Sequence, residues 1–185
     1  NGVRKPFTLN DGKYEPPLGC YDTLTLNAEG FLFSTPAGMT LQFNSGGFLR
    51  WQEDRVGNRV TYNLDLQNRI SRATTSDGRT LDYAYDPELN RVNRITDWSG
   101  REWNYQYASN DALVKVVFPD GACNTLEYDD QNQLVAVYDA YSNLVHSAAH
   151  DTNSQYTTAY GEGPVEYSMG YDAVQNVTTK RDNQD

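Results

Sequence analysis

The chain has 185 residues, a length typical of about one domain with a hydrophobic core. Its aromatic content of 12% excludes a disordered coil. The net charge of −10 repels phosphate groups and argues against general nucleic-acid binding and against docking on an anionic membrane. The sequence has no apolar run of the roughly 20 residues that a membrane-spanning helix needs.

Residues 1–20 are expected to form an irregular lead-in or cap, because prolines and glycines recur there. The chain begins with Asn1 rather than Met, so we expect a processed chain or a fragment of a longer one. The wide separation of Cys20 and Cys123 matches no metal or redox motif. A long-range disulfide and two free thiols both remain open.

Residues 21–53 are expected to form atypical first hairpins. Leu24 and Leu26 alternate with polar residues before Gly30, and Leu41 and Phe43 do so before the next glycine pair. Alternation of this kind is typical of strands, and the glycines supply the turns between them.

Residues 54–141 contain a repeat with a period of 21 or 22 residues. Each copy has a glycine in a turn-type segment, large apolar residues five and seven positions later, and in three copies an Asp directly after them. A fifth copy has Ser142 at the glycine position. The residues that define the repeat are Gly57, Gly78, Gly100, Gly121, Tyr85, Asp86, Tyr107, Tyr128, Asp129, Tyr171 and Asp172.

Each copy is interpreted as a β-hairpin. Trp103, Tyr105 and Tyr107 alternate with polar residues, which directs one face of the first strand to a core. In the return segment, apolar residues such as Leu113 and Val116 stand three apart, and we expect a strand with a bulge there. The sequence therefore predicts an all-β fold of tandem hairpins that form an extended, curled antiparallel sheet.

The end of the chain is less regular. Residues 142–163 are expected to be a degenerate repeat or an insertion, and 164–185 the last repeat with a frayed tail. His146 and His150 stand four apart, so a helix with a metal or base role stays open, although two lone histidines are more often surface residues. We predict no metal site and no cofactor.

Tandem hairpins leave two sheet edges open and gather aromatic rings on one face. We therefore predict that an isolated piece of this length either associates end to end or is cut from a longer chain.

The array resembles the Rhs/YD-repeat family. Residues 76–97 read Ser-Asp-Gly-Arg-Thr-Leu-Asp-Tyr-Ala-Tyr-Asp-Pro-Glu-Leu-Asn-Arg-Val-Asn-Arg-Ile-Thr-Asp. This is similar to the family pattern of a Gly-Arg turn, a strand ending in Tyr-x-Tyr-Asp, and a return strand after Asn-Arg. The resemblance covers roughly residues 8–180, and residues 10–24 resemble the segment that precedes the first repeats of bacterial members.

The resemblance implies a non-enzymatic structural segment, near the start of the repeat array, that builds an extracellular shell or filament. Its expected partners are neighbouring repeats of a longer chain or identical subunits, with an enclosed toxin domain or surface glycans as further possibilities. The expected location is secreted or on the cell surface, in bacteria.

Two alternatives belong to other functional classes. A hydrolase needs two carboxylates that face each other across a cleft, whereas the Asp residues here recur at turns, so we predict no catalytic residue. A carbohydrate-binding surface module needs an exposed aromatic ring, and Trp98 is the candidate because it follows a strand end in a turn.

Overall fold

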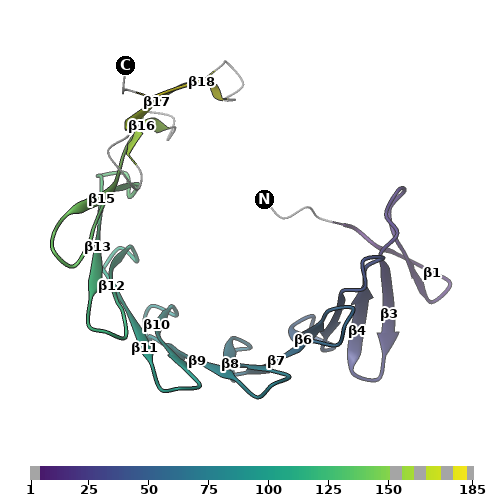
Figure 1. The fold of residues 1–185 in the computed structure, drawn as a ribbon. Coiled ribbons are helices and arrows are strands. Elements are labelled where there is room, and N and C mark those ends of the chain that lie inside the picture. The colour runs from purple at the N-terminus through teal and green to yellow at the C-terminus, as the bar shows by residue number, and fades with distance from the viewer. Residues whose placement is uncertain (1–4, 151–155, 161–165, 172–176, 183–185) are drawn as a thin grey trace. The chain divides into compact units, whose positions relative to one another are not determined.

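The computed structural model describes residues 5–150, 156–160, 166–171 and 177–182, with side chains over 5–150. All its elements are strands, and no helix occurs among the described residues, which confirms the all-β prediction (Figure 1). None of these residues belongs to a helix with the length and apolar character needed to cross a membrane. The strands are β1 (Thr8–Asn10), β2 (Lys13–Glu15), β3 (Thr23–Asn27), β4 (Gly30–Ser34), β5 (Thr40–Phe43), β6 (Leu49–Glu53), β7 (Arg59–Leu64), β8 (Ile70–Thr75), β9 (Thr80–Tyr85), β10 (Val92–Asp97), β11 (Glu102–Tyr107), β12 (Leu113–Val117), β13 (Cys123–Tyr128), β14 (Leu134–Tyr138), β15 (Leu144–His150), β16 (Tyr156–Tyr160), β17 (Glu166–Tyr171) and β18 (Val177–Asp182).

The chain divides into two compact units. The first comprises Asn1–Ala84 and Thr96–Gly100, and the second comprises Tyr85–Ile95 and Arg101–Asp185. Successive strands pair antiparallel from β1 to β9 and again from β11 to β18. Within each of these two runs, a strand therefore lies beside its neighbour in the sequence, as tandem hairpins require.

One turn geometry connects most of these strands. In the turn of residues 65–69, the Asn68 N–H donates to the Asp65 carbonyl at 3.0 Å, and the Asp65 N–H donates to the Arg69 carbonyl at 2.8 Å. Asn68 has φ of 61°. These bonds are typical of a type I turn followed by a left-handed residue in a bulge. The left-handed position is filled by Gly38, Gly47, Gly57, Asn68, Gly78, Gly100, Asp111, Gly121, Asn132 and Ser142.

The return strands contain the bulge that the spacing of three predicts. Gln106 pairs with Lys115 and Tyr107 pairs with Leu113, so that Val114 is an extra residue on β12. Tyr105 pairs with Val116. Because opposed residues share a face, the bulge places Leu113 and Val116 on the same face as the two tyrosines. The same shift recurs between β13 and β14 and between β7 and β8.

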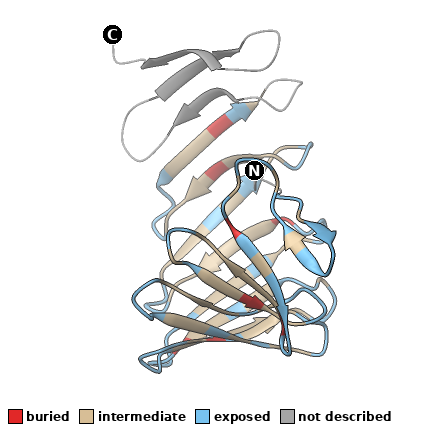
Figure 2. Ribbon diagram, turned by 90° about the vertical axis from the view of Figure 1, so that its right-hand side faces the viewer, coloured by how far each residue is buried: buried red, intermediate tan, exposed pale blue. Residues whose placement is uncertain are grey.

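The described sheet has a thin core. Its buried apolar residues are alanines, and most strand positions are half-buried while the turns are exposed (Figure 2). The largest fully buried side chain is Gln42, which exchanges amide hydrogen bonds of 2.9 and 3.2 Å with Asn27. The buried apolar residues are Ala73, Ala112, Ala136 and Ala148.

The first segment contains a hairpin of its own. β1 and β2 are joined by Asp11 and Gly12, which both have positive φ, as a type I′ turn requires. The ring of Tyr14 meets that of Phe31 edge-on, with centroids 5.8 Å apart. Cys20 and Cys123 are both free thiols.

Candidate functional site

The Asp of the repeat caps the turn that follows it. The Asp129 Oδ1 atom accepts the backbone N–H groups of Gln131 and Gln133, each at 2.9 Å. Asp65 makes the same pair of bonds in its own turn. In the turn after Asp86, which is one residue longer, the carboxylate accepts the N–H groups of Glu88 and Leu89. These carboxylates are therefore engaged in holding the backbone.

Capping aspartates also occur in turns that carry the repeat glycine or Ser142. The Asp54 carboxylate accepts hydrogen bonds from the Asn58 side chain and backbone, which hold its pKa below the ordinary 3.8 despite opposing desolvation. The Asn143 side chain and backbone act in the same way to lower the pKa of Asp139. Gly57, Gly78, Gly100 and Gly121 have φ between 84° and 89° in these turns.

The Tyr of the repeat fastens neighbouring hairpins together. The Tyr107 hydroxyl donates to the Val92 carbonyl at 2.7 Å, and the Tyr128 hydroxyl donates to the Leu113 carbonyl at 2.9 Å. Each acceptor is the first residue of the preceding return strand. Burial, opposed in part by Arg91, raises the pKa of Tyr107 above 10.0. The same rings thus pack on the sheet and tie one repeat to the previous one.

The remaining repeat residues lie at matching strand ends. Tyr85 is the last residue of β9, and Tyr171 is the last residue of β17. Asp172 lies outside the described residues.

The repeats belong to a stretch of sequence that matches a known family. Residues 35–159 match the family model described as the Teneurin YD-shell. The chain belongs to the YD-shell family. The resemblance to Rhs/YD repeats inferred from residues 76–97 is thereby confirmed.

Curated relatives support the same grouping. This chain is 35% identical over 133 residues to the tRNA nuclease WapA of Bacillus subtilis (strain 168), a match that covers 71% of this chain and 6% of that protein. It is 29% identical over 65 residues to the probable deoxyribonuclease RhsB of Dickeya dadantii (strain 3937), covering 35% of this chain and 4% of that protein. The chain therefore spans a small part of the length of these relatives.

Solved structures share the fold. The crystal structure of TcdB2-TccC3 without its hypervariable C-terminal region superposes with a TM-score of 0.59 and 13% identity, over 96% of this chain and 12% of that one. TcdB2-TccC3-TEV gives a TM-score of 0.55 and 11% identity, over 94% and 13% of the two chains.

Trp98 lies in the turn of the YD repeat between β10 and β11, and its side chain is 59% exposed. The guanidinium carbon of Arg79 lies 5.6 Å from the centroid of its ring. Trp51 and Trp103 are half-buried, and an arginine lies over each of them as well. Sequence reasoning missed these Arg–Trp contacts, although each arginine closely follows a turn glycine.

The histidines of the degenerate copy lie on a strand. β15 includes both His146 and His150, so the helix that would have brought them together is not formed there. Four residues along a strand span about 14 Å, too far for two ring nitrogens to share one ion. Among the described residues, no three His, Cys, Asp or Glu side chains form a group that could hold a metal.

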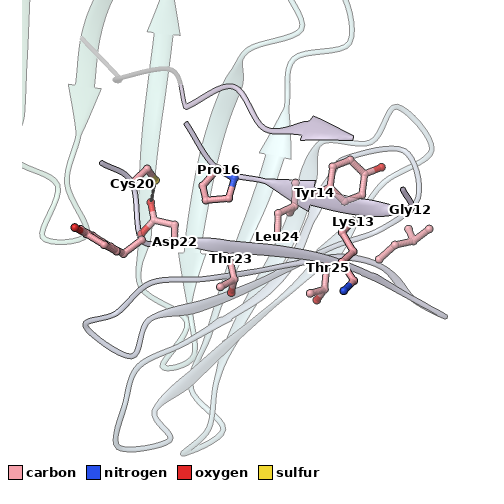
Figure 3. Close-up of a pocket in the computed structure, with 11 residues that line it drawn as sticks. Gly12, Lys13, Tyr14, Pro16, Cys20, Asp22, Thr23, Leu24 and Thr25 are labelled. Carbon is pink, nitrogen blue, oxygen red and sulfur yellow. Dashed lines mark hydrogen bonds between the residues drawn. The ribbon is translucent and has the colours of Figure 1, made fainter. Parts of the chain in front are cut away.

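A pocket that the sequence did not indicate opens between β2 and β3 (Figure 3). Its volume is about 610 Å³. Tyr14 and Pro16 lie on one wall, and Leu24 on the other. At one end Asp22 accepts hydrogen bonds from Cys20, at 3.3 Å, and from Lys5.

Proposed function

We propose that this chain is a wall segment of a larger YD shell and that its function is structural. The observation that carries this proposal is that pairing between repeats has the same form as pairing within them. β12 and β13 belong to successive repeats, yet they pair antiparallel at three positions and are further joined by the Tyr128 hydroxyl. A sheet with this property can be lengthened hairpin by hairpin.

We infer that the segment itself performs no chemistry. The repeat carboxylates of Asp65, Asp86 and Asp129 accept backbone N–H groups, so they are poorly placed to act as an acid–base pair. The nuclease names belong to relatives of which this chain spans 4–6%. Nuclease and glycosidase assays on the 185-residue chain are expected to give no turnover. Reproducible turnover that is abolished by substitution of one of these three aspartates would contradict the inference.

The proposed setting follows from the family. Neighbouring repeats of a longer chain or identical subunits are the expected partners, an enclosed toxin domain is the expected cargo, and the expected location is outside a bacterial cell. The segment is proposed to lie near the start of the repeat array.

Electron cryomicroscopy of the product of the whole open reading frame tests the shell role. A hollow shell with residues 35–159 in its wall is the expected result. A structure in which the face of β11–β14 that carries Tyr105, Tyr107 and Tyr128 packs against a compact domain of another fold would overturn the proposal.

A carbohydrate-binding surface is a second candidate, which the exposure of Trp98 favours. Its ring is accessible, and Arg79 lies near it with a donor group that a sugar hydroxyl or carboxylate could use. This arrangement could offer a stacking surface for a glycan.

A glycan array with the wild-type chain and Trp98→Ala tests this second candidate. Tyr141→Ala is the matched control, because Tyr141 is 87% exposed in a turn of the same geometry. Binding that Trp98→Ala removes and Tyr141→Ala retains would support the candidate. Absence of binding by the wild-type chain would rule out this second candidate and leave the structural role.

A further inference from the structure

The sequence contains three Asp-Gly steps, and all three lie in exposed turns between strands. In chain order they are Asp11-Gly12, Asp77-Gly78 and Asp120-Gly121. An Asp-Gly step is prone to a spontaneous rearrangement of the main chain, because glycine has no side chain to keep its amide nitrogen away from the preceding carboxyl group. Since all three steps are exposed to water, the bonding of these two groups decides which step reacts.

At the second step, the turn holds both reacting groups. The Gly78 N–H donates to the Thr75 carbonyl at 2.9 Å. The Asp77 carboxylate accepts the Thr75 hydroxyl and forms an ion pair of 3.1 Å with Arg79. The Thr75 hydroxyl, together with the Arg79 N–H and charge and opposed in part by desolvation, holds the pKa of Asp77 below its ordinary 3.8. The rearrangement needs the protonated carboxyl group, which loses an oxygen as water, so these contacts protect Asp77.

The third step is held by a turn of the same geometry. The Gly121 N–H donates to the Phe118 carbonyl at 2.9 Å. The Asp120 Oδ1 atom accepts the Ala122 N–H at 3.0 Å. Here too, the amide nitrogen and the carboxylate must both leave their partners before they can meet.

The first step has neither restraint. Within the part of the chain that the structure describes, the Asp11 carboxylate accepts no hydrogen bond and forms no ion pair, and the Gly12 N–H reaches no acceptor. The hairpin that this step closes is short, since β1 and β2 pair at three positions and β2 pairs with β3 at one. Segments with so few pairing positions open more readily than the centre of a sheet. The backbone between Asp11 and Gly12 can therefore rotate to the geometry that ring closure needs.

We propose that Asp11 is a site of spontaneous conversion to isoaspartate, and that the fold protects Asp77 and Asp120 from the same reaction. The Gly12 amide nitrogen attacks the Asp11 Cγ atom and forms an N–C bond, while one carboxyl oxygen leaves as water with the carboxyl proton and the amide proton. Water then opens the cyclic imide at one of its two carbonyl carbons, which restores aspartate or gives isoaspartate. Because isoaspartate carries the main chain through Cβ and Cγ, the product has a longer turn and is expected to disturb the pairing of β1 with β2.

Incubation of the full 185-residue chain in heavy-oxygen water at near-neutral pH tests this assignment. Each opening of the imide brings in one oxygen atom of the solvent, so mass spectrometry of the digested chain measures the reaction at each step, and electron-transfer fragmentation separates isoaspartate from aspartate. Label is expected to enter at Asp11 at least about tenfold faster than at Asp77 or Asp120, since two hydrogen bonds must open first at each of those steps. In urea, where the turns are lost, the three rates are expected to become similar.

Two variants separate the effect of bonding from that of sequence. Asp11→Glu is expected to abolish labelling in its turn, because glutamate would have to close a larger ring. Thr75→Val removes the hydroxyl that the Asp77 carboxylate accepts, so it is expected to raise labelling at Asp77. Labelling at Asp120 is the control in this variant and is expected to stay low.

The proposal is overturned if Asp77 or Asp120 takes up label as fast as Asp11 in the folded chain. It is also overturned if Asp11 reacts in urea but not in the folded chain, or if the difference among the three steps persists in urea. Unchanged labelling of Asp77 in the Thr75→Val chain would contradict the protection ascribed to its carboxylate contact. None of these outcomes bears on the shell role of the repeats.

Discussion

At the residue scale, four residue types adopt the left-handed backbone conformation that the turns require. The fourth residue of each regular turn has positive φ, and glycine, Asn, Asp and Ser all occupy it, as at Gly78, Asn132, Asp111 and Ser142. Glycine adopts this conformation without a Cβ clash, and Asn and Asp tolerate it better than other side chains do. Ser142 therefore preserves the turn in the copy that lacks glycine.

Two glycines are expected to respond differently to alanine. A Cβ on Gly30 would lie 2.4 Å from the Phe43 carbonyl oxygen, whereas a Cβ on Gly78 has nothing within 4 Å. Gly78→Ala is expected to cost the strain of a left-handed alanine, about 1–2 kcal/mol. Gly30→Ala adds a backbone clash and is expected to cost more, as judged from urea unfolding midpoints. Equal midpoints for the two variants would contradict the close approach at Gly30.

The tyrosine hydroxyls allow a matched comparison on one strand. Tyr107 and Tyr105 both lie on β11, but only the Tyr107 hydroxyl has a hydrogen bond to a carbonyl within the described residues. Tyr107→Phe is expected to lose about 0.5–1.5 kcal/mol of unfolding free energy, while Tyr105→Phe is expected to change it little. Thermal or urea unfolding measures both. Similar losses in the two variants would argue against the fastening role of Tyr107.

Acid sensitivity is expected to arise from the turn-capping aspartates. The Asn143 side chain and backbone hold the pKa of Asp139 below 3.8 in the folded chain. Because the folded pKa is the lower one, the carboxylate stabilises the fold above pH 3.8, and this contribution is lost as the pH falls through the lowered value.

Asp139→Ala is therefore expected to unfold at a lower urea concentration than the wild type at pH 7, with a smaller difference at pH 3. Asp130→Ala serves as the control, because its carboxylate makes no hydrogen bond among the described residues, and it is expected to leave the midpoint at pH 7 unchanged. A pH-independent deficit for Asp139→Ala would show that the carboxylate charge is not what stabilises this turn.

At the scale of the element, the hairpins were predictable because their signals are local. The spacing of Leu113 and Val116 predicts a bulge, since two side chains three apart share a strand face only if one residue is extra. The structure has that extra residue, Val114. The roles of Gly121 and Tyr107 likewise depend on residues close in the sequence or one period away.

Other features could not be predicted because they depend on contacts without a sequence period. Gln42 is buried and hydrogen-bonded to Asn27, which lies on another strand and does not occupy a position of the repeat. The pocket beside β3 lies where β2 pairs with that strand at one position, and the extent of such pairing is not encoded in composition. The exposure of Trp98 could be predicted from its place in a turn, but the position of Arg79 over its ring could not.

At the scale of the whole molecule, little apolar side-chain volume is fully buried among the described residues. The buried apolar residues there are alanines, whereas the rings of Tyr105, Tyr107 and Tyr128, which form the tyrosine face of β11–β14, are only partly removed from water. An apolar face of this kind normally marks an interaction surface. In the proposed shell, surrounding repeats would cover the tyrosine face, whereas in an isolated chain this face stays only half-buried.

The isolated 185-residue chain is therefore expected to associate as its concentration rises. Each copy carries a net charge of −10, which opposes association at low ionic strength. Raising the salt concentration screens this repulsion while strengthening or preserving apolar contacts, so the average mass in sedimentation should increase with salt. Because the contacts involve the tyrosine face, Leu26→Asp on the edge of β3 is expected to leave the association unchanged. A monodisperse, folded monomer at all concentrations and salt levels would show that the half-buried face needs no partner, and would remove the physical reason for assembly.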